Sequence, residues 1–361
     1  MLASATVIPN SFGSQRRSSL RTVRFLVPGT TGRFRCGGLL VELQTARLLQ
    51  SIAAVEVVTY RQREEEHPFL ADLLKAEPPT CGHDQPLWIV SWGFEVPAQL
   101  RRLRGRALAY HAHSSGYGFD LPSGVPVLAV SRNTLGYWGD RAPRNPLYLL
   151  PNALEAAWME RGDRSGALPR SIDVLVQQRK SSAYVLERLV PALRARGLKV
   201  EVQSGWVDDL VDLFNQSTVY LYDSADYWRS YRVSEGFGLP PIEALACGCV
   251  VFSSLNHALA DNLDPAVVGH QIGAGTLAAD VEAISSAVAD PAAWRLNSDA
   301  LEAVLHPLSE AVLLERWRRV LTAVDQHWQR LSQGERPLVA PAPRQVRWHR
   351  RWLKLRRLLR R

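Results

Sequence analysis

Short apolar stretches rich in β-branched and aromatic residues alternate with helix-like stretches along most of this 361-residue chain. In the first half the strand-like stretches fall at residues 23–27, 55–59, 88–91, 107–110 and 127–130. They are almost wholly apolar, which is typical of strands that a parallel sheet buries on both faces. The alternation therefore favours an α/β fold in which helices cover both faces of a parallel sheet.

The alternation restarts after a polar segment with several glycines at residues 162–169. Strand-like stretches follow at 172–176, 199–203, 219–222 and 250–253, and long helices at 277–289 and 308–329 close the pattern. A chain of this length usually divides into two domains. We predict a flexible basic lead at 1–22, a Rossmann-like domain at 23–160, a second one at 161–330, and a spacer with a basic tail at 331–361.

The formal net charge of +8 is concentrated at the two ends of the chain. Residues 344–361 hold nine basic residues, residues 1–24 hold four arginines, and neither segment has an acidic residue. Without them, residues 25–343 carry a net charge of −5. An acidic body argues against nucleic acid as a partner, because nucleic-acid binding depends on a basic surface.

The cysteines are Cys36, Cys81, Cys247 and Cys249. They are too few and too irregularly spaced for a disulfide framework or a zinc site, so we expect reduced, buried thiols. No stretch approaches the ~20 apolar residues of a membrane span, and no apolar core of an export signal follows Arg16 and Arg17. We therefore expect a cytoplasmic protein.

The most informative stretch is S-E-G-F-G-L-P-P-I-E-A-L-A-C-G, residues 234–248. Gly236 and Gly238 permit close backbone approach, and Pro241 suits the first turn of a helix that Gly248 ends. A glycine-containing loop before a helix N-terminus presents free N–H groups and attracts an anion such as a diphosphate.

Two glutamates flank this expected anion site. Glu243 is predicted in the first helical turn, where its carboxylate can accept hydrogen bonds from sugar hydroxyls. Glu235 lies eight residues earlier in the loop, on the other side of the site.

This run resembles the signature of the family 4 glycosyltransferases of group 1 type, in which E-G-F-G-L-P-P-x-E-A-x-A-x-G recurs with the same spacing. The resemblance covers fourteen contiguous residues, 235–248. It implies the GT-B fold, in which two Rossmann-like, doubly wound parallel-sheet domains face a cleft. It also implies a hexosyltransferase-like enzyme that moves a sugar from a nucleotide-sugar to an acceptor, retains the anomeric configuration, and needs neither a metal nor another cofactor.

The resemblance also implies roles for individual residues of the loop. Glu243 binds the ribose hydroxyls of the nucleotide-sugar, and Glu235 acts on the transferred sugar as a catalytic residue. The N–H groups of Gly236, Phe237 and Gly238 face that sugar or the donor phosphates.

Basic residues suited to the phosphates follow the first strand of the second domain. Arg179 and Lys180 lie at the carboxyl end of that strand, where ligands collect in open α/β sheets. The family usually separates its arginine and lysine by about four residues, whereas here they are adjacent, which leaves open which of the two makes the main phosphate contact. Gly37 and Gly38 resemble the Gly-Gly turn that faces the donor phosphates across the cleft.

His111 and His113 follow the strand at 107–110, where relatives carry a histidine in the cleft near the donor sugar or the acceptor. One of the two is expected to be a packed or surface residue. We favour His113 as the catalytic histidine because it is nearer the loop that begins at Ser114.

The chain also departs from the family pattern. Ala153 replaces the glycine of a Pro-Asn-Gly sequence, and Leu-Asn-His-Ala at 255–258 replaces the Gly-Gly-x-x-Glu that often follows the signature. Residues 227–233, rich in aromatics and arginine, look inserted. Since the last two departures lie near the expected donor pocket, the resemblance does not identify the donor.

The basic tail at 344–361 is predicted to form an amphipathic helix. Helical geometry places Trp348, Trp352, Leu355 and Leu359 within about 60° of one another, and basic residues cover most of the rest. This pattern is typical of an interfacial helix at an anionic membrane. A disordered solubilising tail and a nucleic-acid-binding tail are the alternatives.

We therefore hypothesise an enzyme at the inner membrane face that uses a glycan or lipid-linked acceptor, such as a precursor of a cell-surface polysaccharide. The alternative function is a non-catalytic membrane-associated adaptor built on a glycosyltransferase body. Nucleotide-sugar epimerases share the fold, but the signature argues against them.

Overall fold

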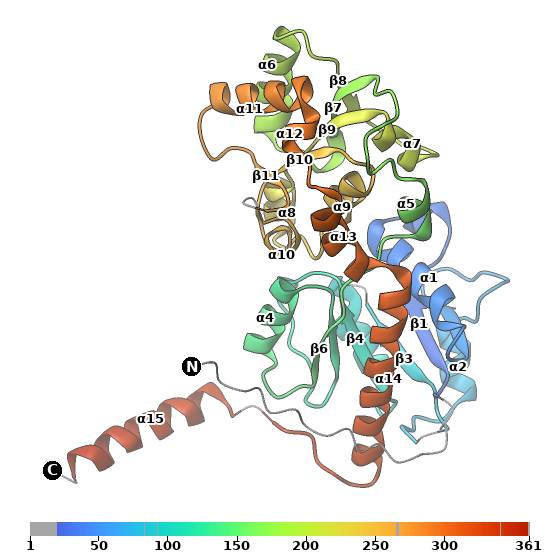
Figure 1. Ribbon diagram of the computed structural model, residues 1–361. Coiled ribbons are helices and arrows are strands. Elements are labelled where there is room, and N and C mark those ends of the chain that lie inside the picture. Colours follow the sequence, from blue (N-terminus) through green and yellow to red (C-terminus); the bar gives the residue numbers. More distant parts are fainter. Residues whose placement is uncertain (1–19, 83, 92, 265–266, 340, 360–361) are drawn as a thin grey trace, which may run out of the picture.

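The computed structural model describes residues 20–82, 84–91, 93–264, 267–339 and 341–359. Most of the predicted lead at 1–22 and the last two residues of the tail lie outside these ranges. Figure 1 shows two halves joined by α13 and α14, with the helix α15 projecting away from both.

The first half is built on a six-stranded sheet with the order β2-β1-β3-β4-β5-β6, and every pairing in it is parallel. Its strands are β1 (Val23–Val27), β2 (Val55–Thr59), β3 (Leu87–Val90), β4 (Leu108–Ala112), β5 (Val127–Ala129) and β6 (Leu147–Leu149). The five strands predicted in this half are confirmed to within two residues at each end.

The second half is built on a five-stranded parallel sheet with the order β11-β10-β9-β7-β8. Its strands are β7 (Ile172–Gln177), β8 (Val200–Gln203), β9 (Ser217–Tyr222), β10 (Val250–Ser253) and β11 (His270–Gln271). Strand β7 lies between β9 and β8, so the residues after β7 and after β9 emerge at the same edge.

Helices connect these strands and cover the sheets (Figure 1). They are α1 (Gly37–Leu49), α2 (Leu70–Ala76), α3 (Val96–Arg102), α4 (Arg132–Arg141), α5 (Ala156–Arg161), α6 (Val190–Ala195), α7 (Leu210–Asn215), α8 (Ala225–Tyr231), α9 (Leu239–Ala246), α10 (Leu259–Asn262), α11 (Leu277–Ala289), α12 (Pro291–Trp294), α13 (Ser298–Leu305), α14 (Glu310–Ser332) and α15 (Pro343–Leu358). A π-helical turn, Val185–Leu189, precedes α6, and short 3₁₀ turns occupy Gly32–Phe34, Gly93–Glu95, Gln178–Lys180 and His306–Leu308.

Helix α14 belongs to the first half, although it follows the second half in sequence. Its buried side chains Leu313, Trp317 and Val324 share a hydrophobic cluster with Phe25 and Leu128 of the first sheet. The predicted second domain, 161–330, therefore includes a helix that packs on the first sheet instead. The amphipathic spacing of α14 predicts a buried face, but does not tell which sheet that face covers.

Two chain segments cross between the halves side by side. The first leads from β6 into α5, and the second leads from α13 into α14. The backbone N–H of Leu154 in the first donates to the carbonyl oxygen of Leu308 in the second, at 2.9 Å.

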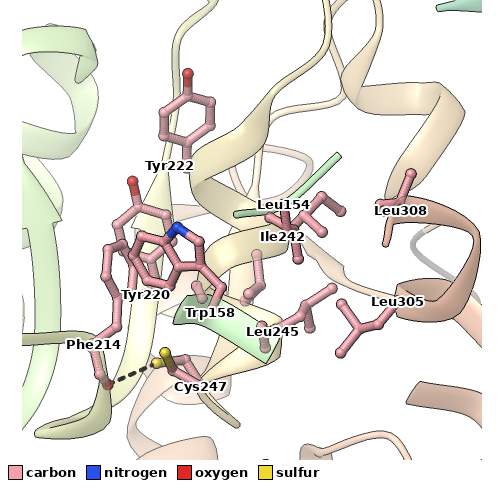
Figure 2. Packing of buried hydrophobic residues seen from close by; sticks show 14 of the residues in the cluster. Leu154, Trp158, Phe214, Tyr220, Tyr222, Ile242, Leu245, Cys247, Leu305 and Leu308 are labelled. Carbon is pink, nitrogen blue, oxygen red and sulfur yellow. Dashed lines mark hydrogen bonds between the residues drawn. The ribbon is translucent and has the colours of Figure 1, made fainter. Parts of the chain in front are cut away.

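The core of the second half holds α9 in place. Figure 2 shows Ile242 and Leu245 of this helix among the side chains of a cluster that also contains Trp158, Phe214 and Leu305. The packing of one face of α9 fixes the direction of its N-terminus relative to β9.

The four cysteines are free, as predicted. Cys247 and Cys249 are buried, whereas Cys36 and Cys81 are only half-buried, so the prediction of burial is wrong for the latter two. Burial raises the pKa of the Cys249 thiol to about 11, which makes it unreactive at neutral pH.

The halves touch through the loop after β4 and the loop before α9. The hydroxyl of Ser114 donates to the carbonyl oxygen of Ser234 at 2.6 Å, and the N–H of Ser115 donates to Oγ of Ser234 at 2.9 Å. Elsewhere between the halves, the guanidinium of Arg35 lies 5.0 Å from the ring centroid of Trp206.

The predicted tail helix is α15, which Figure 1 shows extended away from the rest of the molecule. Its Trp348, Leu355 and Leu358 are 74%, 59% and 70% exposed. Among the described residues, no helix combines the length and apolar composition that a membrane crossing requires.

Candidate active site

The loop before α9 ends in a glycine with left-handed backbone torsions. Gly238 has a φ of +83° and precedes Leu239, the first residue of the helix. Pro240 and Pro241 therefore lie in the first turn, as expected from proline's fixed φ and missing N–H. Glu243 lies just beyond that turn, so the prediction that it occupies the first turn is wrong.

The N–H groups of Gly236, Phe237 and Gly238 have no hydrogen-bond partner in the part of the chain that the structure describes. All three residues are buried. Buried backbone donors are nearly always paired with protein, water or ligand. Three such donors in sequence beside a helix N-terminus therefore form a site suited to an oxygen-rich or anionic ligand.

Glu235 is buried beside these donors, with 4% of its surface exposed. Its Oε2 accepts hydrogen bonds from the hydroxyl of Tyr222 and from Nε1 of Trp228, each at 2.6 Å. Tyr222 ends β9, and Trp228 lies on α8. The sequence analysis assigned no role to either; the only signal was that Trp228 lies in the segment that looks inserted.

Lys180 joins the same group from the end of β7. Its Nζ lies 3.6 Å from Oε2 of Glu235 and 4.7 Å from the ring centroid of Trp228. Arg179 is exposed and has no acidic partner among the described residues. The structure thus brings Lys180, but not the side chain of Arg179, to Glu235.

Glu243 lies near Lys180 and is half-buried. Burial and the negative charge of Glu155 raise its pKa to about 8, and the positive charge of Lys180 only partly offsets this. The side chain still keeps some solvent exposure. At neutral pH the carboxyl group is therefore mostly protonated and can both donate and accept hydrogen bonds.

The backbone of His113 contacts the loop before α9, whereas its ring contacts Glu42. Its carbonyl oxygen packs on Gly236, at a place where a Cβ would overlap it. Its Nε2 lies 2.6 Å from Oε1 of Glu42, which also lies 2.7 Å from Nδ1 of His111. His111 is fully buried, whereas His113 keeps some exposure, as expected of the two.

Glu42 is the buried centre of this group, and the sequence analysis did not single it out. Burial alone would raise its pKa, but the charge of His111 and hydrogen bonds from both rings override it and lower the pKa to about 2. Glu42 is three residues after Leu39 and four before Ala46, so it lies on the buried face of α1. That position was the signal that could have revealed it.

The ligating atoms of Glu42, His111 and His113 lie within 4.8 Å of one another, as in a group that could hold a metal ion. The hydrogen bonds from both rings to one carboxylate oxygen account for this closeness. Oε2 of Glu42 and Nε2 of His111 are buried and have no hydrogen-bond partner among the described residues.

Gly37 and Gly38 begin α1, as predicted. A Cβ on either glycine would meet no atom within 4 Å, so packing does not require glycine there. No hydrogen bond among the described residues joins them to Lys180 or to the loop at 234–238.

Comparison with known protein families finds one match, within the second half. Residues 187–300 match the family model of the glycosyl transferases group 1. The matched region contains α8, α9 and both glutamates of the loop and helix. The chain has no significant match among curated protein sequences.

Solved structures share the fold of nearly the whole chain. A glycosyltransferase from Rickettsia africae has a TM-score of 0.61 at 11% identity, over 85% of this chain and 99% of that one. Anabaena Alr3699/HepE, in complex with UDP-glucose, has a TM-score of 0.59 at 16% identity, over 84% and 99%. An α,α-trehalose-phosphate synthase (UDP-forming) from Burkholderia vietnamiensis has a TM-score of 0.58 at 11% identity, over 85% and 99%. The predicted GT-B fold is thereby confirmed.

Proposed function

We propose that this protein is a glycosyltransferase that takes a sugar from a nucleotide-sugar. The observation that carries the proposal is the row of three N–H groups at 236–238, which have no partner in the described chain and lie next to Glu235 and Lys180. The match of residues 187–300 to the group 1 family supports it. UDP-glucose is the first donor to test, because one of the similar structures holds it.

The N–H groups and the basic residues of the site bind the diphosphate of such a donor. The N–H groups and the ammonium of Lys180 stabilise the negative charge that develops on the departing diphosphate. Each such charge-assisted hydrogen bond contributes roughly 1.5–3 kcal/mol. Arg179, exposed after the same strand, adds a second cation when the diphosphate is bound.

Glu243 and Glu235 act on the two sugars of the donor. Glu243, mostly protonated at neutral pH, hydrogen-bonds the ribose hydroxyls as donor and acceptor. Glu235 contacts the transferred sugar once its present partners, Tyr222 and Trp228, yield one of their hydrogen bonds. His113, held by Glu42, faces the sugar or the acceptor from the first half, and Gly37 and Gly38 face the phosphates.

The finer assignment is to the retaining, metal-independent enzymes of family 4. Its support is the signature at 235–248, together with Lys180 beside the N–H groups of the loop, groups that can meet a diphosphate without a metal ion. We assign the Glu42 group to holding His113 rather than to binding a metal, because both rings already hydrogen-bond its carboxylate.

The acceptor in this proposal is a glycan or a lipid-linked precursor at the cytoplasmic face of a membrane. Helix α15 supports it, since its exposed tryptophans and leucines share the helix with arginines and a lysine that attract anionic lipid. Because α14 packs on the first sheet, the helix that follows it is attached to the half that would take the acceptor.

A thermal-shift screen of nucleotide-sugars tests the proposal, followed by turnover with the best ligand. A ligand of the folded state raises the melting temperature in proportion to its saturation. We expect Glu235→Ala to abolish turnover and Lys180→Ala to weaken binding, with both proteins folded. The anomeric configuration of the product, read by proton NMR, tests retention. Full turnover in Glu235→Ala would exclude this site.

A further inference from the structure

A cavity lies beside the candidate site, between the two halves. It has a volume of about 420 Å³. Ser115 and Gly116 of the loop after β4 line one side, and the end of α8 and residues 256–257 line the other. Ser234, which precedes Glu235, also lines it, so the cavity adjoins the catalytic loop.

The charged side chains that line this cavity are basic. They are Arg229 and Arg232, and no aspartate or glutamate is among the described residues that line it. Arg229 pairs with Asp226 at 2.9 Å, in an exposed ion pair of the kind that contributes little to stability. Arg232 is exposed and has no acidic partner among the described residues.

His257 adds a neutral donor to the two cations. Its Nδ1 accepts a hydrogen bond from the backbone N–H of Glu235 at 3.3 Å. Burial lowers its pKa, and the neutral ring then carries its proton on Nε2. That N–H has no partner among the described residues.

Two residues of the cavity have left-handed backbone torsions. Arg232 and His257 have φ values of +56° and +55°, and no other residue except glycine has a positive φ in the described chain. Arg232 adopts this conformation as the C-cap of α8, and helices commonly end in a left-handed residue. Histidine adopts these torsions more often than most residues with a side chain.

The same residues come from the two places where the sequence departs from the family signature. Arg229 and Arg232 lie in the segment at 227–233 that looks inserted, and His257 lies in the Leu-Asn-His-Ala that replaces Gly-Gly-x-x-Glu. The departures thus converge on one basic cavity.

We propose that this cavity binds the phosphate group of the acceptor, a phosphate monoester. Two guanidinium groups match its double negative charge and planar oxygen pairs, and Nε2–H of His257 supplies a further hydrogen bond. That this phosphate belongs to the acceptor rests on the proposed function, in which Glu235, beside the cavity, acts on the transferred sugar. The phosphate belongs either to a water-soluble sugar phosphate or to a lipid.

Calorimetric titration of the full chain tests the proposal with three probes. Inorganic phosphate reports on the group alone, glucose 6-phosphate stands for a soluble acceptor, and butyl phosphate stands for a lipid phosphate. The double variant Arg229→Gln/Arg232→Asn removes both cations, and asparagine tolerates the left-handed backbone at 232. We expect each probe to bind this variant about tenfold or more weakly than the wild-type protein. The tighter of the two esters identifies the source of the phosphate.

Two comparisons separate this result from a folding defect and from the donor site. Arg144→Asn, an exposed arginine in the turn after α4, serves as the matched control and should bind all probes like the wild-type protein. Arg179→Gln/Lys180→Gln should lose binding of UDP but keep that of the phosphate esters. Equal binding of the esters by the wild-type protein and Arg229→Gln/Arg232→Asn would overturn the proposal, whereas absence of UDP binding by the wild-type protein would contradict only the donor assignment.

Discussion

Gly236 packs so closely on the carbonyl oxygen of His113 that a Cβ at position 236 would overlap that oxygen. Gly116 makes the reciprocal approach, since a Cβ there would lie 2.6 Å from the carbonyl oxygen of Arg232. Hydrogen bonds between Ser115 and Ser234 lie between these two contacts. Two loops from different halves therefore meet backbone to backbone, and this meeting depends on the absence of side chains.

Gly236→Ala should separate these loops. The added methyl group has backbone on its far side rather than a flexible side chain, so it can fit only if the loops move. We expect turnover to fall at least about tenfold and stability to fall by about 1–3 kcal/mol. Kinetics with the identified donor and urea unfolding measure the two effects.

Gly136→Ala is the control for that substitution. Gly136 lies within α4, and a Cβ there meets no atom within 4 Å. Alanine favours a helix over glycine by about 0.5–1 kcal/mol, so this variant should be slightly more stable and fully active. Equal activity of Gly136→Ala and Gly236→Ala would show that the close contact is not needed.

Glu42→Gln should lower stability at neutral pH. The ionised carboxylate accepts hydrogen bonds from two histidine rings, and the neutral amide is a weaker acceptor, so the expected loss is about 1–3 kcal/mol. The folded-state pKa of about 2 lies below the ordinary value of 4.5, so this stabilisation is present above pH 4.5 and is lost as the pH falls toward 2. Urea unfolding at a series of pH values should show that the difference in unfolding free energy between the variant and the wild-type protein becomes smaller in acid.

The exposed Glu201→Gln is the matched control and should track the wild-type protein at every pH. If the unfolding free energy of Glu42→Gln differs from that of the wild-type protein by the same amount at every pH, Glu42 is not ionised in the folded protein. Chelation of metal ions should leave both the stability and the turnover of the wild-type protein unchanged. A loss on chelation that zinc restores would reassign the group to metal binding.

Glu243→Gln should be more stable than the wild-type protein at neutral and higher pH, whereas Glu42→Gln should be less stable. The pKa of Glu243 is raised to about 8, so its neutral form is favoured by folding, and this contribution is lost as the pH rises from 4.5 through 8. The glutamine variant stays neutral, so its melting temperature should rise relative to that of the wild-type protein between pH 5 and 8.5. At neutral pH its affinity for the donor should stay near that of the wild-type protein, because the amide, like the protonated carboxyl group, both donates and accepts hydrogen bonds.

Scanning calorimetry at the two pH values and a donor titration check this prediction. Glu160→Gln, an exposed glutamate on α5, provides the comparison and should follow the wild-type protein in both measurements. A melting temperature for Glu243→Gln that runs parallel to wild type over this range would contradict the raised pKa.

Removal of residues 344–361 should abolish binding to anionic vesicles. Each basic residue near such a surface contributes at most about 1 kcal/mol, and the exposed tryptophans add apolar contact. Flotation with phosphatidylglycerol-containing vesicles should recover the full chain and not the truncated one. Trp348→Ala/Trp352→Ala should give an intermediate result, and raised salt should release the full chain. Equal flotation of the full chain with purely zwitterionic vesicles would refute an electrostatic attraction of the tail to anionic lipid.

The sequence predicted most of the scaffold and the loop at its centre. Local patterns were sufficient there, because a buried parallel strand such as Val23–Val27 is apolar throughout and a turn such as that at Gly238 needs glycine. Glu235 and Lys180 were both predicted to follow strands of the second sheet, and the structure places their charged groups 3.6 Å apart because β7 and β9 end at the same sheet edge.

The partners of those residues could not be read from local patterns. Glu42 and His113 are 71 residues apart in sequence, and only the packing of α1 against β4 and its loop brings them together. Trp228 bonds Glu235 from a segment with no counterpart in the family signature. The position of α14 depends on which of two sheets offers the larger uncovered apolar face, and helical periodicity does not carry that information.

The hydrogen bond from Leu154 to Leu308 joins the two segments that cross between the halves. Two crossings held side by side leave one easy motion, a rotation about the line through them. Since α14 is fixed to the first sheet, a protein held to a surface by α15 keeps its first half nearer to that surface. The second half, which carries the N–H groups at 236–238, is then the part that can turn, once the hydrogen bonds from Ser114 and Ser115 to Ser234 open.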